Sequence, residues 1–229
     1  MLPSEGNWSQ FRRKVREDRS DVKELDARLQ QLTTLLESSR TTVRRRLASR
    51  ANGASAAGIV KYFRDFVDIV EPWQELFDGA RTLDLVVMYS SSWRNTYLKC
   101  AREMLHKPRS RVRIVLPAAN PSLLRAYAAR LDTRPDVIAS RIKDAFIEFK
   151  DLGKYGNVEI YKTTYYMNHA LYLFDSAGIF AYYSFRIDRC PTPAVLIENG
   201  DLLDFARKDF SWLVSPENPA SKLVFTSTK

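Results

Sequence analysis

The sequence predicts an α/β fold, a mixed β-sheet flanked by helices, with an N-terminal α-helical arm in front of it. In the middle of the chain, strand-like apolar runs alternate with helical patterns, which is typical of parallel strands joined by right-handed crossovers. After residue 157, short runs rich in aromatic and β-branched residues follow one another with turn signals between them, which indicates antiparallel hairpins. The sheet is therefore expected to contain both kinds of strand pairing.

Residues 1–52 are expected to form a basic helical arm. An apolar seam with steps of three and four residues runs through Val22, Leu25, Leu29, Leu32 and Leu36, the pattern of a coiled coil. Polar residues interrupt the seam on both sides. Two interpretations stay open: a coiled coil, and an amphipathic helix that packs on the main domain.

Basic clusters flank this seam. They comprise Arg12, Arg13, Lys14, Arg44, Arg45 and Arg46. Such clusters are either solvated helix ends or contacts to nucleic-acid phosphates. The chain carries a formal net charge of +9, which favours a polyanionic partner without naming it. The arm shows no second, groove-reading helix, so a helix-turn-helix is not predicted.

A run of small residues from Asn52 to Gly58 marks the predicted boundary of the main domain, which spans residues 59–214 and is followed by a tail at 215–229. Apolar spacing predicts a helix from Ile59 to Val70, and Pro72 can begin the next helix. Strands are expected at 83–89, 112–116, 158–161, 170–174, 179–185 and 194–197. Further helices are expected at 93–106, 121–131, 137–152 and 201–213.

Composition excludes several classes of protein. No apolar run approaches the roughly 20 residues of a membrane helix, and the N-terminus lacks a signal-peptide core. Cys100 and Cys190 lack paired spacing, and they do not combine with His106 and His169 into a zinc pattern. Glycine-rich phosphate loops and hydrolase motifs are absent from the sequence. We therefore expect a cytoplasmic protein with no membrane contact, no metal and no cofactor.

The segment around His169 resembles the C-terminal part of phospholipase D-like domains. That family has His-x-Lys-x4-Asp, and then Gly-Ser-x-Asn on the next strand. Here His169 stands in the His position and Ser184, fifteen residues later, in the Ser position. Leu171 replaces the Lys, Arg186 replaces the Asn, and Asp175 comes one residue early. The resemblance implies a degenerate member of the family.

A closer similarity is to an uncharacterised domain of this type at the C-terminus of bacterial helix-turn-helix regulators. It covers roughly residues 73–214. The matching residues are Thr163-Thr164-Tyr165, Asn168, Phe174-Asp175 and Pro193-Ala194-Val195-Leu196. This resemblance implies a bacterial regulatory domain and brings no activity with it.

Phospholipase D-like catalysis needs two histidines in one site, so a half-size chain would supply the second by forming a homodimer. Losing the Lys removes a preorganised cation, which typically costs about 10²- to 10³-fold in rate. Binding of an anion is therefore favoured over its cleavage, and His169 is only a candidate catalytic residue. The predicted ligand-binding residues are Tyr165, Asn168, His169, Tyr183, Ser184 and Arg186. Purely structural roles are the alternatives: His169 as a core or interface residue, Arg186 as a salt-bridged strand residue, and the tyrosines as ordinary aromatic residues of the sheet.

The sequence thus predicts a non-catalytic regulatory or sensor protein, a phospholipase D-like pseudoenzyme, that binds an anionic, nucleotide-like ligand. One alternative is a phosphodiesterase or nuclease that acts across a homodimer. Another is a nucleic-acid-binding protein that uses the basic arm.

Overall fold

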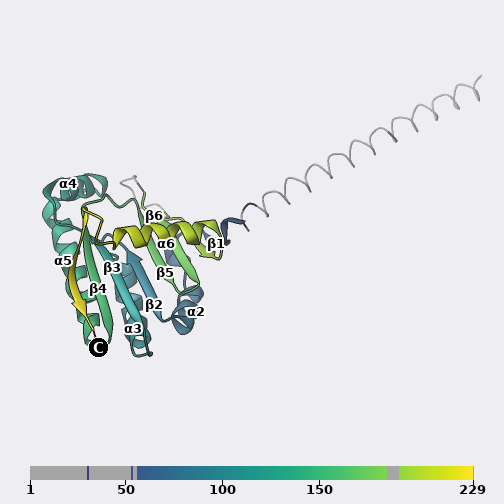
Figure 1. Ribbon diagram of the computed structural model, residues 1–229. Coiled ribbons are helices and arrows are strands. Elements are labelled where there is room, and N and C mark those ends of the chain that lie inside the picture. Colours follow the sequence, from purple (N-terminus) through teal and green to yellow (C-terminus); the bar gives the residue numbers. More distant parts are fainter. Residues whose placement is uncertain (1–29, 31–52, 54–55, 185–190, 229) are drawn as a thin grey trace, which may run out of the picture. The chain divides into compact units, whose positions relative to one another are not determined.

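The computed structural model of the chain describes residues 30, 53, 56–184 and 191–228. The body presented below belongs to the second of two units, residues 54–229. Its strands form one eight-stranded sheet in the order β1-β7-β6-β5-β2-β3-β4-β8. Helices cover both faces of this sheet, and α6 crosses the face that is turned to the viewer (Figure 1).

The strands and helices have the following bounds. The strands are β1 (Ile59–Phe63), β2 (Thr82–Val86), β3 (Arg111–Pro117), β4 (Asn157–Thr163), β5 (His169–Phe174), β6 (Ala177–Tyr182), β7 (Ala194–Glu198) and β8 (Ser221–Ser227). The helices are α2 (Glu71–Gly79), α3 (Ser91–Leu105), α4 (Pro121–Arg130), α5 (Pro135–Asp151) and α6 (Asp201–Leu213). Short 3₁₀ turns η1 (Phe66–Asp68) and η2 (Leu152–Lys154) complete the body.

The sheet is mixed, as the sequence predicts. Strands β2, β3 and β4 run parallel to one another, whereas β5 pairs antiparallel with β2 and begins a run of antiparallel neighbours. The crossovers from β2 to β3 and from β3 to β4 pass through α3 and through α4 with α5. Proline at the first turn of α2, α4 and α5 suits these helix starts, because an N–H there has no intrahelical partner.

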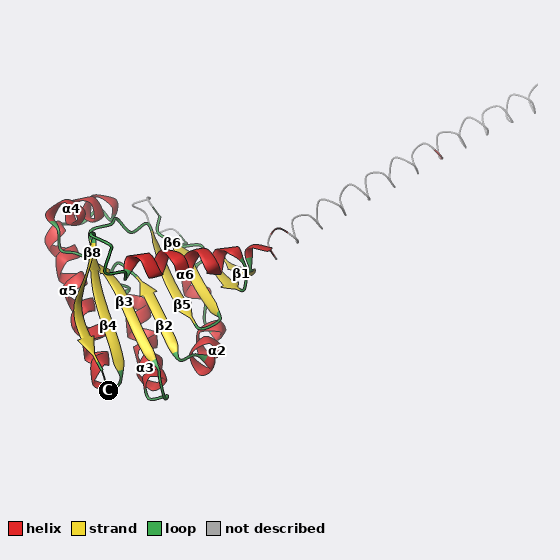
Figure 2. Cartoon of the chain, viewed as in Figure 1, coloured by secondary structure: helices red, strands yellow, loops and turns green. Residues whose placement is uncertain are grey.

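Two apolar cores lie on opposite faces of the sheet. On one face α2, α3 and α5 pack on alternate strand residues such as Leu85, Ile114 and Tyr172. On the other face α6, α4 and the beginning of α5 pack on the intervening residues, among them Leu171. Figure 2 shows the same division, with α6 in front of the strands and α2, α3 and α5 behind them. The alternation places neighbouring residues of one strand in different layers.

Two terminal elements differ from the sequence-based expectation. Residues 59–63 form the edge strand β1, not a helix, and pair antiparallel with β7. Residues 221–227, which were expected to lie in a tail, form the opposite edge strand β8 and pair with β4. Both segments are rich in β-branched and aromatic residues, and each gains a ladder of hydrogen bonds from a strand that is distant in the sequence.

Asp175, in the turn between β5 and β6, has a structural role. Its carboxylate accepts hydrogen bonds from the amides of Arg81 (2.7 Å) and Thr82 (3.0 Å), at the beginning of β2. Its carbonyl oxygen accepts a further bond from the Arg207 side chain on α6. Asp175 therefore ties the hairpin to a central strand and to the helix above it.

Among the helices of the described part, none is long and apolar enough to cross a membrane.

Candidate ligand-binding site

A pocket opens beyond the carboxyl end of β2, where the chain leaves the sheet and enters α3. Ser90, the residue before α3, has a left-handed backbone with φ 47° and ψ 46°. Its hydroxyl shares a hydrogen bond of 2.6 Å with the hydroxyl of Tyr172 on β5. Ligands of open α/β sheets bind outside the carboxyl ends of the strands, so this edge is where a site is expected.

We call this cavity the Arg130 pocket. Its volume is about 430 Å³, within the range of roughly 300–1,000 Å³ that is typical of small-molecule sites. Most of its lining is apolar, aromatic or hydroxyl-bearing. The lining residues are Asp65–Val67, Met88–Trp93, Arg130, Leu131, Ala170, Tyr172, Ala181, Tyr183, Ser184 and Thr192.

Arg130, the last residue of α4, is the cation among the described lining residues of this pocket. It is only 7% exposed, and its Nη1 donates to the carbonyl oxygen of Met167 over 3.3 Å. Its guanidinium carbon lies 5.6, 5.4 and 5.1 Å from the ring centres of Tyr127, Tyr166 and Tyr183. Among the described residues no carboxylate pairs with it, and its Nε has no hydrogen-bond partner there.

A second buried arginine provides a comparison. Arg94, on α3, is 4% exposed, but it forms an ion pair with Glu148 and donates from Nε to the carbonyl oxygen of Tyr89 over 2.8 Å. Burial of a charge costs several kcal/mol unless a partner compensates it. Arg94 has that partner, whereas Arg130 relies on aromatic faces and one carbonyl. The Arg130 pocket therefore holds a positive charge that is only partly compensated.

Further donors surround the cavity. The first N–H groups of α3 have no acceptor within the helix, and the side chain of Ser90 does not cap them. Trp93, at 1% exposure, also lines the pocket, and its indole Nε1 lacks a hydrogen-bond partner among the residues that the structure describes. The N-terminal, positive end of the α3 dipole adds to the positive potential in the pocket. The arrangement suits a ligand that supplies acceptors and negative charge.

One acid and one phenol complete the lining. The carboxylate of Asp65 accepts from the amides of Val67 (3.4 Å) and Thr192 (3.3 Å). The hydroxyl of Tyr183 accepts from the amide of Met88 over 3.2 Å. Burial raises the pKa of Tyr183 to about 12, although that hydrogen bond and the charge of Arg130 act in the opposite direction. Tyr183 is therefore a neutral wall of the pocket at physiological pH.

Most of the described members of the predicted ligand-binding set line two neighbouring cavities. Tyr183 and Ser184 line the Arg130 pocket. Tyr165 and His169 line a second cavity of about 330 Å³ on the α6 side, which we call the His169 pocket. The lining residues of the His169 pocket are Val86, Thr163, Tyr165, Tyr166, Met167, His169, Asp209, Trp212 and Leu213. Asn168 is in neither lining but contacts a residue of each: its carbonyl oxygen accepts from the Tyr183 amide (3.0 Å), and its side chain shares a hydrogen bond with His169.

His169 is held by its neighbours on the sheet. Its Nδ1 shares a hydrogen bond of 2.6 Å with the Asn168 side chain, and its ring stacks on Phe180 of β6 at a centre-to-centre distance of 4.4 Å. Burial lowers the pKa of His169 below its ordinary value, and the negative charge of Asp209 offsets part of that effect. The imidazole is therefore neutral at pH 7, the form in which it could accept a proton.

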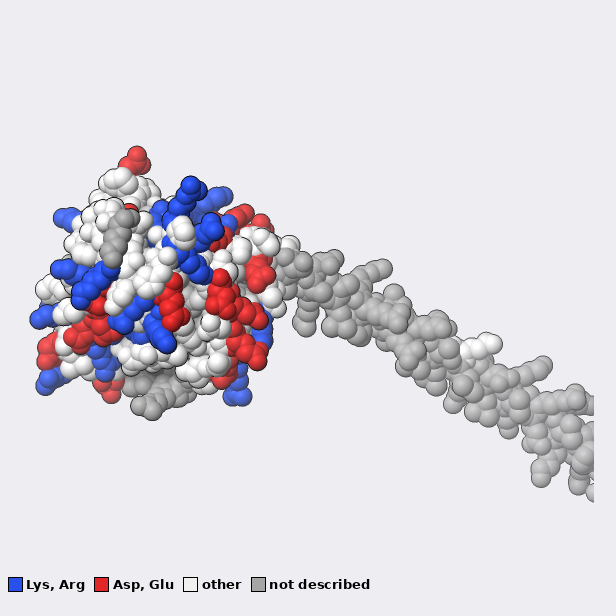
Figure 3. Space-filling view, turned by 90° about the horizontal axis from the view of Figure 1, so that it is seen from below, with Lys and Arg blue, Asp and Glu red and all other residues white. Residues whose placement is uncertain are grey.

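Some predicted residues cannot be placed. Arg186 and the basic residues of the arm, Arg12, Arg13, Lys14, Arg44, Arg45 and Arg46, lie outside the described residues. On the part of the body seen from below, acidic and basic side chains are interspersed (Figure 3). That face presents both signs of charge to a partner. Among the described histidines, cysteines and acids, no cluster could hold a metal ion.

Sequence reasoning missed Arg130 and Trp93 as site residues. Arg130 does have a signal: it follows Leu123 and Tyr127 on the apolar face of the predicted helix at 121–131. A charged residue in such a position must find a partner or a pocket. Trp93 has no comparable signal, because a tryptophan on the apolar face of a helix is most often core.

Comparisons with known proteins add little to this picture. No protein-family model matches the chain, and no curated protein matches it. Among solved structures the chain is similar to TrmBL2, an archaeal chromatin protein with a novel mode of DNA binding, at a TM-score of 0.40 and 14% identity. The match covers 88% of this chain and 66% of that one, just under two thirds.

Proposed function

We propose that the body is a non-catalytic binding domain for a small anion with a planar, nucleotide-like part, and that the ligand occupies the Arg130 pocket. The observation that carries this proposal is the guanidinium of Arg130, which is 7% exposed and, within the described part of the chain, has no acidic partner. A phosphate or carboxylate there would supply the missing charge. Such anions bind arginine through two parallel hydrogen bonds.

The rest of the pocket supports the same class of ligand. The beginning of α3 offers backbone N–H groups to an anion, and Trp93 offers an indole N–H. Tyr89 and Phe66 line the cavity as well; Phe66 stacks on Tyr172, and the guanidinium of Arg141 lies 5.4 Å from the ring centre of Tyr89. Aromatic side chains stack on planar rings, so a ligand with an anionic group and a base-like ring would use both parts of the lining.

Binding is favoured over cleavage by the surroundings of His169. Phospholipase D-like chemistry would need a cation for the developing phosphoryl charge, but Leu171 is buried in the α6-side core. The Arg130 and Ser184 side chains line a different cavity from His169. A phosphodiesterase that acts across a homodimer remains the alternative. Hydrolysis of bis(p-nitrophenyl) phosphate that disappears in His169→Ala would favour that alternative.

The test compares AMP with adenosine by isothermal titration calorimetry. The two probes share the base and the sugar and differ in the phosphate. We expect AMP to bind at least tenfold more tightly, a difference of about 1.4 kcal/mol, and we expect Arg130→Met to abolish that preference. Arg125→Met is the matched control, because Arg125 is an exposed arginine on the same helix.

Two outcomes would contradict this proposal: no binding of AMP or of inorganic phosphate to the freshly purified protein, or an unchanged AMP affinity in Arg130→Met. Loss of folding does not confuse the test. Exchange of a buried charge without an acidic partner for an apolar side chain of similar length removes its desolvation cost, which offsets the lost hydrogen bond to the Met167 carbonyl. We therefore expect Arg130→Met to unfold at the same temperature as the ligand-free parent or above it.

The arm would localise or transmit the response to binding. Native mass spectrometry of the full chain reports the number of subunits together with any retained small molecule, and a dimer is the expected result. Nucleic-acid binding through the arm predicts an affinity that falls steeply with salt. That affinity should also fall when Arg44, Arg45 and Arg46 are neutralised.

A further inference from the structure

The His169 pocket differs in charge from the Arg130 pocket. Among the residues that the structure describes, its lining includes no lysine and no arginine, and Asp209 is the only carboxylate there. Asp209 lies on α6, half-buried, and none of the ion pairs formed by the described residues includes it. Burial keeps the pKa of His169 below its ordinary value, so the imidazole adds no positive charge at pH 7. The lining as a whole is negative.

Aromatic side chains surround this carboxylate and remain open to solvent. Tyr165, Tyr166 and Trp212 are 44%, 39% and 46% exposed, although each lines the cavity. Tyr166 stacks on Tyr127 at 4.8 Å between ring centres and also contacts the guanidinium of Arg130, 5.4 Å from its ring centre, so Tyr165 and Trp212 are the rings left for a ligand. Exposed aromatic side chains that are grouped around one cavity, unlike singly exposed ones, can mark a binding site. Aromatic faces beside an acid are the surroundings that bind ammonium and guanidinium groups.

The base of the cavity is rigid and apolar. Val86, Met167 and Leu213 are 3%, 5% and 9% exposed and belong to the α6-side core. These residues can contact the methyl or methylene groups of a cation while the charge lies near Asp209. A volume of about 330 Å³ accommodates a small molecule and excludes a bulky one.

We propose that the His169 pocket binds a small organic cation, an alkylated ammonium or a guanidinium, through the carboxylate of Asp209 and the rings of Tyr165 and Trp212. This site is separate from the anion site. The sequence predicted an anionic ligand beside His169, whereas the ligand proposed here is a cation. The two pockets thus differ in the charge of the ligand they would bind, although the β4–β5 connection joins them: Arg130 donates to the carbonyl oxygen of Met167, which lines the His169 pocket.

The experiment uses choline and 3,3-dimethylbutan-1-ol, its uncharged analogue of the same shape. Each is titrated into the full chain at constant ionic strength, and affinity is measured from chemical-shift changes. We expect choline to bind at least tenfold more tightly than the neutral analogue. Equal affinity of the two probes, or no binding of choline, would overturn the proposal.

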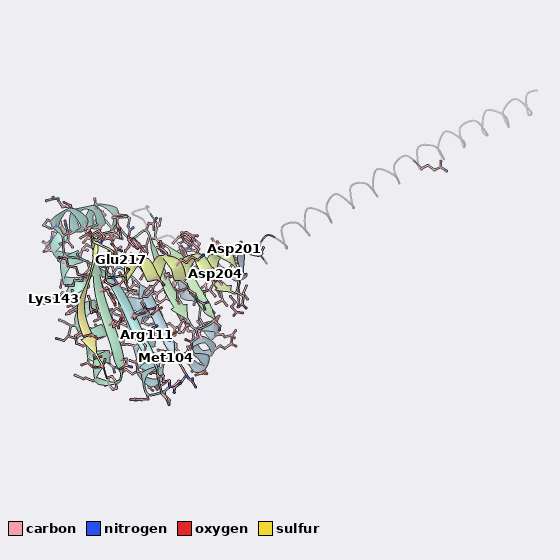
Figure 4. All side chains as sticks on the ribbon, viewed as in Figure 1. Met104, Arg111, Lys143, Asp201, Asp204 and Glu217 are labelled. Atoms are coloured by element: carbon pink, nitrogen blue, oxygen red, sulfur yellow. The ribbon has the colours of Figure 1, made fainter. Side chains whose placement is uncertain are left out.

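The variants Asp209→Asn and Trp212→Leu distinguish the contribution of the carboxylate to binding from that of the aromatic rings. Asp209→Asn should lower the affinity for choline about tenfold and leave the affinity for the neutral analogue unchanged. Trp212→Leu should lower the affinity for both probes. Asp204→Asn is the matched control, since Asp204 lies on the same helix (Figure 4), is exposed, and is absent from the lining of the pocket. An Asp209→Asn variant that keeps the parent's unfolding temperature and still binds choline with the parent's affinity would also overturn the proposal.

Discussion

The guanidinium of Arg130 and the backbone of Met167 are directly joined, since Nη1 donates to the Met167 carbonyl oxygen over 3.3 Å. The amide of Met167 donates in turn to the hydroxyl of Tyr127 over 2.8 Å. Both polar backbone groups of one residue in the β4–β5 connection are thus bound by side chains of α4. Because Met167 lines the His169 pocket, this connection forms the wall between the two cavities.

Tyr127→Phe tests the anchoring of that wall. Removal of the hydroxyl leaves the buried amide of Met167 without its acceptor, which costs about 1–3 kcal/mol. Burial already raises the pKa of Tyr127 to about 12, so the hydroxyl is neutral in the parent. Urea unfolding measures the loss. Tyr62→Phe, at an exposed tyrosine of β1, should leave stability unchanged, and an equal loss in both variants would contradict the assignment.

Asp175→Ala tests the tie between the β5–β6 hairpin and β2. The carboxylate accepts from two backbone amides, those of Arg81 and Thr82, and hydrogen bonds to a charged group contribute about 1.5–3 kcal/mol when they are not fully exposed. Because Asp175 is exposed, we expect a loss of about 1–2 kcal/mol in chemical denaturation. Ser176→Ala, one residue later in the same turn, is the control. An Asp175→Ala variant with the stability of the parent would show that these hydrogen bonds do not stabilise the fold.

The pair Arg113 and Asp84 joins β3 to β2 under α6. Its two bonds measure 2.8 and 2.6 Å, and Phe210 of α6 lies over the guanidinium with its ring centre 4.8 Å away. Arg113→Met alone leaves a partly buried carboxylate unpaired and should cost about 2–4 kcal/mol.

The double variant Asp84→Leu with Arg113→Met removes both charges of that pair. It should recover most of the stability lost in the single variant, because it buries no unpaired charge. Both variants are compared in the same guanidinium chloride titration. A double variant that is less stable than Arg113→Met would show that the ion pair itself stabilises the sheet.

The pKa of His169 predicts a pH dependence of stability. Burial lowers this pKa from an ordinary value of 6.5, so the unfolded chain binds the proton more tightly than the folded one. Stability contributed by the neutral imidazole is therefore present above pH 6.5 and is lost as the pH falls below it. His169→Gln should flatten that part of the stability curve.

Asp209→Asn should have the opposite effect on the same curve. The carboxylate of Asp209 raises the pKa of His169, so its removal lowers that pKa further and steepens the loss of stability in acid. Urea midpoints of the parent and both variants between pH 7.5 and pH 5 measure the effect. Parallel curves for all three proteins would refute the assignment.

Most of the fold follows from local patterns. Asp201–Leu213 is helical at the residues that its apolar spacing predicts, and the strand runs in the middle of the chain pair in both expected directions. The edges of the sheet are different. The spacing of Ile59, Val60 and Phe63 fits a helix as well as a strand, and only pairing with β7 decides between them. Likewise β8 becomes a strand through β4, a partner that no local pattern reveals.

The site was harder to predict, for a geometric reason. The spacing between His169 and Ser184 suggests one shared site, but β6 ends at Tyr182. Beyond that point the regular alternation of strand side chains no longer applies, and Ser184 lines the other cavity. The setting of Arg130 depends on tyrosines from α4, the β4–β5 connection and the end of β6. Such a convergence exists only in the folded chain.

The pairing of the first strand with β7 also constrains how the protein is made. During synthesis β1 leaves the ribosome roughly 130 residues ahead of Ala194–Glu198, its neighbour in the sheet. At about 5–20 residues per second, this delay lasts roughly 7 to 26 seconds. For that time Val60, Tyr62 and Phe63 have no native strand to pair with, and they are open to chaperones or to a neighbouring nascent chain. The body therefore closes late, after nearly all of it has been translated.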